Sequence, residues 1–277
     1  MTHERRTAFV LGGGGRWGAV EVGMLRALRE ARLTPDLILG TSIGAFNGSV
    51  VAADPHGGVD TLTEVWEGLA GSDMFSGGML DRVKAVATLQ PAMHHAGELR
   101  AILEGVHAPN ATFEDLSVPF QCVAASIERA AEHWFTEGPL VDALMATSAV
   151  PVLFPPVEIG TEHYYDGGLV NSVPLRRAVT LGADVIYVLQ VGRVEAPLRP
   201  PAKLYEAALI SFEIARRHTF STAMQEMTDD VTVHLLPSGN PVMFDDWRQL
   251  KWRDTGSTGE LIEGAYEATR DYLSAGH

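Results

Sequence analysis

The stretch Gly40-Thr41-Ser42-Ile43-Gly44 joins a short apolar run to a segment of small residues. The run at 36–39 predicts a buried strand, and residues 45–53 predict a buried helix, so Ser42 lies on the sharp turn between them. Glycines on both sides permit backbone angles that a Cβ atom would forbid, and they keep side chains away from the hydroxyl. The stretch therefore predicts a nucleophilic serine at a strand-to-helix turn.

A second strand-to-helix junction stands near the N-terminus. Residues 7–11 are apolar, four glycines follow at 12–15, and residues 19–30 carry apolar side chains at helical spacing. Such a loop directs several backbone N–H groups, and the positive end of a helix dipole, at one point in space. Without side-chain bulk it can stabilise the oxyanion that forms when a nucleophile attacks an ester carbonyl.

The same glycines also fit a nucleotide site. Gly13-x-Gly15-x-x-Gly18 after a strand is the fingerprint of dinucleotide-binding oxidoreductases. That site also requires an acidic residue about 20 positions on, at the end of the second strand, where it meets the ribose. Asp36 is near in count but opens that strand. A phosphate-binding P-loop fits less well, because Ala19-Val20 stands where Lys and Ser/Thr belong. The oxidoreductase is kept as an alternative.

Asp166-Gly167-Gly168 follows the apolar pair at 164–165, so its carboxylate stands at the end of a strand with room beside it. Acyl transfer by a serine requires a base, and a hydrolase triad would place a histidine late in the chain. None of the late histidines follows a strand in a glycine-flanked loop, and each is interpreted as an ordinary surface or core residue. These are His163, His218 and His234.

Apolar runs alternate with helical patterns along the whole chain. The expected strands are 7–11, 36–39, 120–127, 132–135, a strand ending at 166, 184–191 and 231–236. The expected helices are 19–30, 45–53, 59–69, 140–148, 175–181, 203–227 and 259–274. This pattern predicts a doubly wound, mainly parallel α/β sheet with helices on both faces, in a single domain over 1–277. Residues 71–109 fit either a mobile apolar cover or helices on the sheet edge. The proline-containing segment 195–201 is expected to be a stiff connector.

Composition excludes some functions. A net charge of −14 argues against a nucleic-acid partner, and the adjacent Arg216 and Arg217 are interpreted as a solvated helix face. Cys122 lies in an apolar run and is expected to be a buried strand residue. No stretch approaches the ~20 apolar residues of a membrane span, and the apolar run at 7–11 is too short for a signal peptide. We expect a cytoplasmic protein.

Taken together, the motifs resemble the bacterial patatin-like phospholipases. That family carries a Gly-Gly-Gly-x-Arg/Lys-Gly loop, a Gly-x-Ser-x-Gly turn and an Asp-Gly-Gly/Ala motif, and it uses a serine–aspartate dyad without histidine. The matching segments here are 13–18, 40–44 and 166–168, with further matches at 148–151, 154–156, Asn171 and Pro174. The similarity extends over about 7–237, and residues 238–277 are less distinctive.

The resemblance implies a three-layer α/β sandwich that hydrolyses lipid or related acyl esters through an acyl-serine intermediate. It implies Ser42 as the nucleophile and Asp166 as the general base, with no metal or cofactor. It places the oxyanion hole in the glycine loop, at Gly13, Gly14, Gly15 and Arg16. The remaining motif glycines support these groups: Gly18, Gly40, Gly44, Gly167 and Gly168. A lipid substrate also implies transient contact with a membrane surface.

One position departs from the family pattern. The family's Arg or Lys falls in register on Trp17, and the arginine here comes one place earlier, at Arg16. Backbone donors survive a side-chain change, so hydrolysis is expected to persist. A neutral ester, a lysolipid or a thioester becomes more plausible than a phospholipid. A non-catalytic member that binds acyl chains or a protein partner is the second alternative.

Overall fold

The computed structural model describes residues 5–70, 90–151, 153–191, 198, 200–202, 204–227, 230–239 and 258–276. Within these residues, eight strands form one sheet: β1 (Thr7–Leu11), β2 (Leu37–Thr41), β3 (Phe120–Ser126), β4 (Ala131–Phe135), β5 (Val157–Ile159), β6 (Glu162–Asp166), β7 (Val185–Leu189) and β8 (Thr232–Leu235). Their order is β5-β6-β3-β2-β1-β7-β8, and β4 pairs with β3.

The centre of the sheet is parallel and one side is antiparallel. The pairings β3–β2, β2–β1, β1–β7 and β7–β8 are parallel, whereas β4 and β6 both run antiparallel to β3, and β5 to β6. Of the strands described, β5 was not predicted. The expected mainly parallel arrangement therefore holds from β3 to β8.

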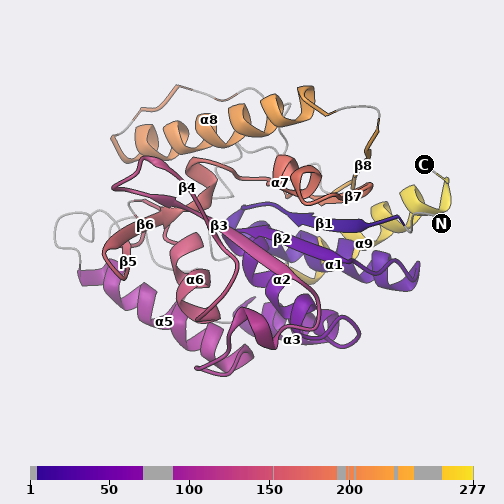
Figure 1. The fold of residues 1–277 in the computed structure, drawn as a ribbon, viewed down its shortest axis with the longest axis horizontal. Helices are drawn as coiled ribbons and strands as arrows, with labels where there is room; N and C mark the ends of the chain where they lie inside the picture. Colours follow the sequence, from indigo (N-terminus) through magenta and orange to yellow (C-terminus); the bar gives the residue numbers. More distant parts are fainter. Residues whose placement is uncertain are drawn as a thin grey trace.

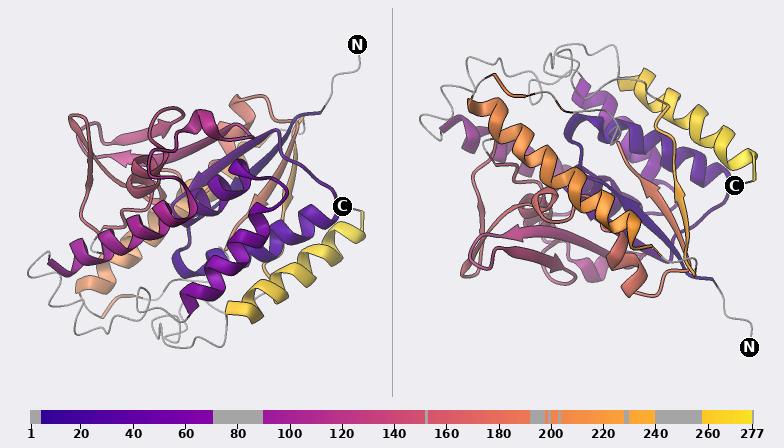
Figure 2. Two further views of the ribbon diagram at one scale, coloured as in Figure 1. Left: turned by 90° about the horizontal axis from the view of Figure 1, so that it is seen from below. Right: turned by 90° about the horizontal axis from the view of Figure 1, so that it is seen from above.

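Helices cover both faces of this sheet, as predicted. The helices described are α1 (Gly18–Glu30), α2 (Ile43–Ala53), α3 (Gly58–Ala70), α5 (Gln90–Val106), α6 (Leu140–Thr147), α7 (Leu175–Thr180), α8 (Leu204–Gln225) and α9 (Thr258–Ser274). Figures 1 and 2 show α7 and α8 on one face of the sheet and the other helices on the opposite face. The α/β three-layer expectation is confirmed.

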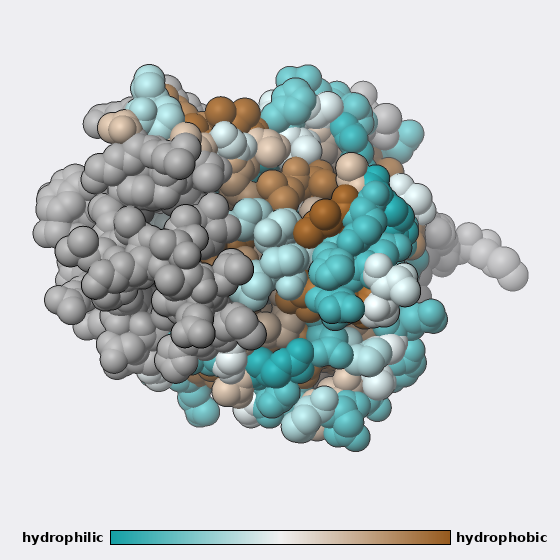
Figure 3. Space-filling model, turned by 90° about the vertical axis from the view of Figure 1, so that its left-hand side faces the viewer, coloured by the Kyte–Doolittle hydropathy of each residue, from teal (hydrophilic) through white to brown (hydrophobic). Residues whose placement is uncertain are grey.

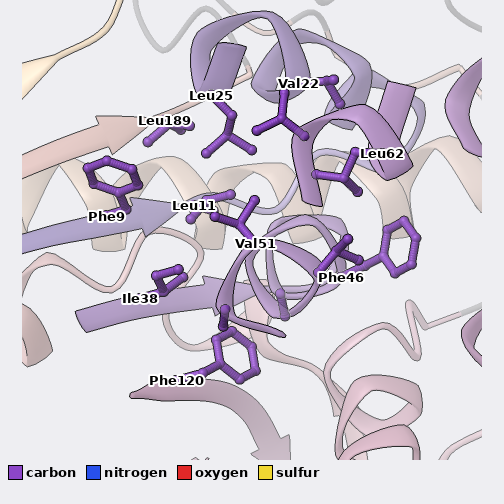
Figure 4. Packing of buried hydrophobic residues seen from close by; sticks show 14 of the residues in the cluster. Phe9, Leu11, Val22, Leu25, Ile38, Phe46, Val51, Leu62, Phe120 and Leu189 are labelled. Carbon is purple, nitrogen blue, oxygen red and sulfur yellow. The ribbon is translucent and has the colours of Figure 1, made fainter. Parts of the chain in front are cut away.

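The core lies on both sides of the central strands because their side chains alternate between two buried layers. Phe9 and Leu11 of β1 join the larger hydrophobic cluster, while Ala8 and Val10 join the smaller cluster beneath α7 and α8. Figure 4 shows the larger cluster, in which side chains of α1 and α2 pack on β1 and β2. This double burial explains why the strands read as continuous apolar runs.

The C-terminal helix α9 packs closely along α1. Gly23 makes this approach possible, since a Cβ atom there would lie 2.1 Å from the backbone oxygen of Ile262. Tyr266 of α9 donates a hydrogen bond of 2.7 Å to Glu30 of α1. Helix α9, from the less distinctive end of the sequence, therefore completes the layer on this face.

Two expectations about connecting segments are only partly tested. Residues 90–106 form one helix, α5, and 71–89 lie outside the described residues, so the cover suggested for 71–109 stays a prediction. Most of the connector at 195–201 also lies outside them. No helix in the described ranges is long and apolar enough to cross a membrane.

Candidate active site

Ser42 occupies the turn between β2 and α2, as the sequence predicts. Its backbone angles are φ 55° and ψ −126°, in a left-handed region that costs a non-glycine residue on the order of 1–3 kcal/mol and persists only where the surroundings enforce it. The flanking glycines allow close packing: a Cβ atom on Gly40 would lie 2.4 Å from Cα of Ala45, and one on Gly44 would lie 2.6 Å from the Gly12 carbonyl oxygen. The turn therefore depends on both glycines.

Hydrogen bonds from two other segments hold this turn. The Ser42 N–H donates to Oγ1 of Thr147 at the end of α6, at 3.0 Å, and the Thr147 hydroxyl donates in turn to the Val123 carbonyl. The Thr41 hydroxyl donates to the Asn171 carbonyl at 2.9 Å. Thr147 was not identified from the sequence, although it directly precedes the family-like segment at 148–151.

Replacing Thr147 with valine is expected to lower the free energy of unfolding by ~1–3 kcal/mol, because the Ser42 N–H loses its acceptor in a buried place. The valine keeps the shape of the side chain. Thr147→Ser is the matched control, since it keeps the hydroxyl and removes only a methyl group. Urea unfolding measures both. Equal stability of the valine variant and the wild type would show that this bond does not hold the turn.

Asp166 is the last residue of β6, and the register of β3 brings it to Ser42. Val123 of β3 pairs with Thr41, and the next residue, Ala124, pairs with Asp166. Ser42 therefore directly follows the residue that pairs with Val123, and Asp166 pairs with the next residue of β3. Strand β3 thus brings the serine and the aspartate together. The sequence predicted both residues, but their contact depends on this pairing of non-consecutive strands.

The two oxygens of Asp166 have different surroundings. The side chain is buried, and Oδ1 accepts a hydrogen bond of 2.7 Å from the Gly168 N–H. Oδ2 is buried without a hydrogen-bond partner among the described residues. Gly168 leaves little room here, because a Cβ atom would lie 2.7 Å from the Phe212 ring and would require that ring to shift. Oδ2 is thus the oxygen that is available to accept a proton.

Burial raises the pKa of Asp166 from 3.8 to about 6. The Ser42 hydroxyl, the Gly168 N–H and the positive charge of Arg216 each lower this pKa, and burial outweighs them. The Ser42 hydroxyl thus lies close enough to affect the carboxyl group, although Oδ2 accepts no hydrogen bond from it. At neutral pH the carboxylate is mostly ionised and more basic than an exposed aspartate, as a general base requires.

The glycine loop borders Ser42. A Cβ atom on Gly13 would lie 3.4 Å from Cβ of Ser42. The Gly13 N–H already donates to the Ser172 carbonyl at 3.0 Å, which does not fit the expected donor role of Gly13. The N–H groups of Gly14, Gly15 and Arg16 have no acceptor among the described residues. They are therefore the free donors of the loop.

The geometry does not favour the dinucleotide alternative. β2 begins at Leu37, so Asp36 precedes the strand, where its Oδ2 accepts the Thr7 N–H at 2.8 Å. The carboxyl end of β2 carries Thr41 and Ser42 in place of an acidic residue. The ribose partner that this site requires is thus absent at the end of β2.

The late histidines, Cys122 and Arg216 lie in surroundings of different kinds. Of the late histidines, His163 binds Glu128 on the surface, His218 is exposed, and His234 stacks on a tyrosine; none contacts Ser42 or Asp166 in the described part of the chain. Cys122 is buried as predicted, and burial raises the pKa of its thiol. No group of metal-ligating side chains gathers among the described residues. The interpretation of Arg216 as solvated is wrong, because it is buried against Glu213.

Comparison with known proteins was made on sequence and on structure. A family model described as patatin-like phospholipase matches residues 9–179, more than half of the chain. The lysophospholipase nte1 of Emericella nidulans is 29% identical over 195 residues, which cover 69% of this chain and 12% of that protein. An uncharacterized NTE family protein of Mycobacterium tuberculosis is 30% identical over 195 residues, covering 69% of this chain and 50% of that protein. The chain thus spans half or less of these relatives.

Two solved structures also align with this chain. VipD from Legionella pneumophila aligns with 98% of this chain and 67% of its own, with a TM-score of 0.46 and 13% identity. The type III effector protein ExoU aligns with 98% of this chain and 53% of its own, with a TM-score of 0.40 and 15% identity.

Proposed function

Because this chain belongs to the patatin-like phospholipase family, we propose that it is a serine acyl hydrolase in which Ser42 is the nucleophile and Asp166 the general base. The observation that carries the proposal is the meeting of three features. Ser42 stands on a strained turn, Asp166 has one buried oxygen without a hydrogen-bond partner among the described residues, and the glycine loop with its free N–H groups borders Ser42.

In the first half of the reaction, Oγ of Ser42 attacks the ester carbonyl carbon while its proton passes to Oδ2 of Asp166. The carbonyl oxygen becomes an oxyanion, which the N–H groups of Gly14, Gly15 and Arg16 stabilise. Losing one such donor typically costs ~3–4 kcal/mol of transition-state stabilisation. The tetrahedral intermediate then collapses, and the alcohol leaves with the proton from Asp166.

In the second half, water replaces the alcohol. Asp166 takes a proton from the water as its oxygen attacks the acyl-Ser42 carbonyl, and the same donors stabilise the second oxyanion. Collapse releases the carboxylic acid, and the proton returns to Oγ of Ser42. The enzyme is restored with one ester bond hydrolysed.

We propose a lipid with an acyl ester as the substrate, reached by transient contact with a lipid surface. The relatives named as lysophospholipases support this class, as does the surface in Figure 3, where hydrophobic side chains gather in the middle of the face. The charge of −14 gives no general attraction to anionic headgroups, so neutral or zwitterionic lipids fit better. The absence of a family-type cation at Trp17 favours neutral esters over phospholipids, and the relatives named as lysophospholipases favour lysolipids over two-chain phospholipids.

The test is fatty-acid release from lysophosphatidylcholine, a monoacylglycerol and diacyl phosphatidylcholine, presented in neutral micelles. We expect release from the first two substrates above that from the third. Release from the diacyl lipid alone would contradict the substrate class but keep the hydrolase. No release from any of the three, with the protein folded, would favour a member that binds acyl chains or a partner without catalysis.

A further inference from the structure

Arg216 is a buried cation on α8, a helix that lies over the Asp166 end of the sheet. Its Nε and Nη2 donate to the two oxygens of Glu213, at 2.7 and 2.9 Å, in a forked pair that fixes the guanidinium plane. Both side chains are less than a tenth exposed. One turn earlier on the same helix, the Phe212 ring packs against Gly168. The helix therefore delivers a rigid positive charge to the site.

The remaining arm of this guanidinium reaches the glycine loop. Nη1 of Arg216 donates to the carbonyl oxygen of Gly13 at 3.3 Å. The Gly13 N–H is held by the Ser172 carbonyl at 3.0 Å. Both polar groups of Gly13 are thus engaged, one by the segment that follows Asp166 and one by α8.

This contact sets the direction of a proposed oxyanion donor. The carbonyl of Gly13 and the N–H of Gly14 belong to one planar trans peptide unit, so they point in opposite directions. Binding the carbonyl toward Arg216 aims the Gly14 N–H away from α8. Were the peptide to turn over, a carbonyl oxygen would replace the donor and repel an oxyanion.

Arg216 also supplies the charge that acts on Asp166. The groups that face this carboxyl group are the Ser42 hydroxyl from the turn, the Gly168 N–H from the residues after β6, and Arg216 from α8. Glu213 lies on the other side of Arg216 and binds its guanidinium. Arg216 lowers the pKa of Asp166 and so keeps the base ionised to lower pH.

We propose that Arg216 is a positioning residue for acyl transfer: it orients the Gly14 N–H by binding the Gly13 carbonyl. In this chain the cation that fixes the glycine loop comes from a distant helix, while Trp17 occupies the loop position where the family carries Arg or Lys. The inference rests on the proposed function, because it assigns a role in that same reaction.

The experiment measures the rate of fluorophosphonate labelling from pH 5 to 9. The main variant is Arg216→Gln, which removes the cation that binds the Gly13 carbonyl, while Arg217 still pairs with Glu213 at 2.6 Å and keeps it from becoming an unpaired buried ion. We expect its plateau rate to fall about 10²-fold, as for one lost oxyanion donor, and its acid limb to move to higher pH. Arg216→Lys keeps the charge, so its acid limb should return toward that of the wild type.

Arg217→Gln is the matched control. Arg217 is the neighbouring arginine and also binds Glu213, at 2.6 Å, but it does not bind the Gly13 carbonyl. We expect its plateau and acid limb to match the wild type. If Arg216→Gln does not fold, Arg216→Lys carries the comparison: it keeps the charge but loses the planar fork, so its plateau rate should fall while its acid limb stays in place.

The outcomes separate the two proposals. A folded Arg216→Gln variant with the wild-type plateau and an unmoved acid limb would overturn the role of Arg216. A loss of thermal stability alone, with labelling unchanged, would show that the residue is merely structural and would also overturn it. Absence of labelling in the wild type would instead overturn the proposed function.

Discussion

Ser42→Ala is expected to lower the rate of ester hydrolysis by at least about four orders of magnitude, because the covalent step has no other nucleophile. The substitution removes one oxygen atom and leaves the N–H that binds Thr147 in place. A p-nitrophenyl ester series from short to long acyl chains measures the loss and also indicates the size of the acyl pocket.

Ser49→Ala is the control for this change. Ser49 lies on the same helix, α2, and is also buried, but its hydroxyl binds the Phe46 carbonyl and His107. The control is expected to keep most of the activity. Equal activity of Ser42→Ala and the wild type would mean that Ser42 is not the nucleophile.

Asp166→Asn is expected to slow hydrolysis by about 10²–10⁴-fold, the usual contribution of a general base. The amide has nearly the same shape, and its oxygen can still accept the Gly168 N–H at the place of Oδ1. It cannot take a proton from Ser42. Thermal unfolding of the same preparation shows whether the fold is intact.

The dependence of the hydrolysis rate on pH tests the same role of Asp166. The pKa of Asp166 is raised to about 6, and the base must be ionised to act. The wild-type rate should therefore fall about tenfold per pH unit below 6 and level off above it. The asparagine variant should lack this acid limb. A wild-type rate that stays constant from pH 5 to 8 would contradict Asp166 as the base.

Much of the fold could be predicted from sequence because the central strands are buried on both faces. Strands such as β1 and β7 read as unbroken apolar runs, which few other structures require. Short or half-exposed elements carry no such signal. β5 has three residues, none of them fully buried, and was not predicted. The partly exposed α5 lies in the region 71–109, for which the sequence left open a mobile cover or helices on the sheet edge.

The residues of the candidate site also differ in whether the sequence could predict them. Ser42, Asp166 and the glycine loop were found because motifs with small residues mark them. Thr147 and Arg216 act on them from α6 and α8, far along the chain, and belong to no local motif. A signal did exist on α8: Glu213 and Arg216 share a helical spacing with Phe220 and Ala223, and this whole face is buried. A charge pair on an apolar face indicates a buried role.

The account depends most directly on where an acyl-like probe binds covalently. We would treat the wild-type protein with a fluorophosphonate, measure the intact mass, and map the modified peptide. The account predicts a single adduct on Ser42. An adduct on any other residue, or no adduct on a folded protein, would contradict the serine hydrolase and turn attention to what the glycine loop binds.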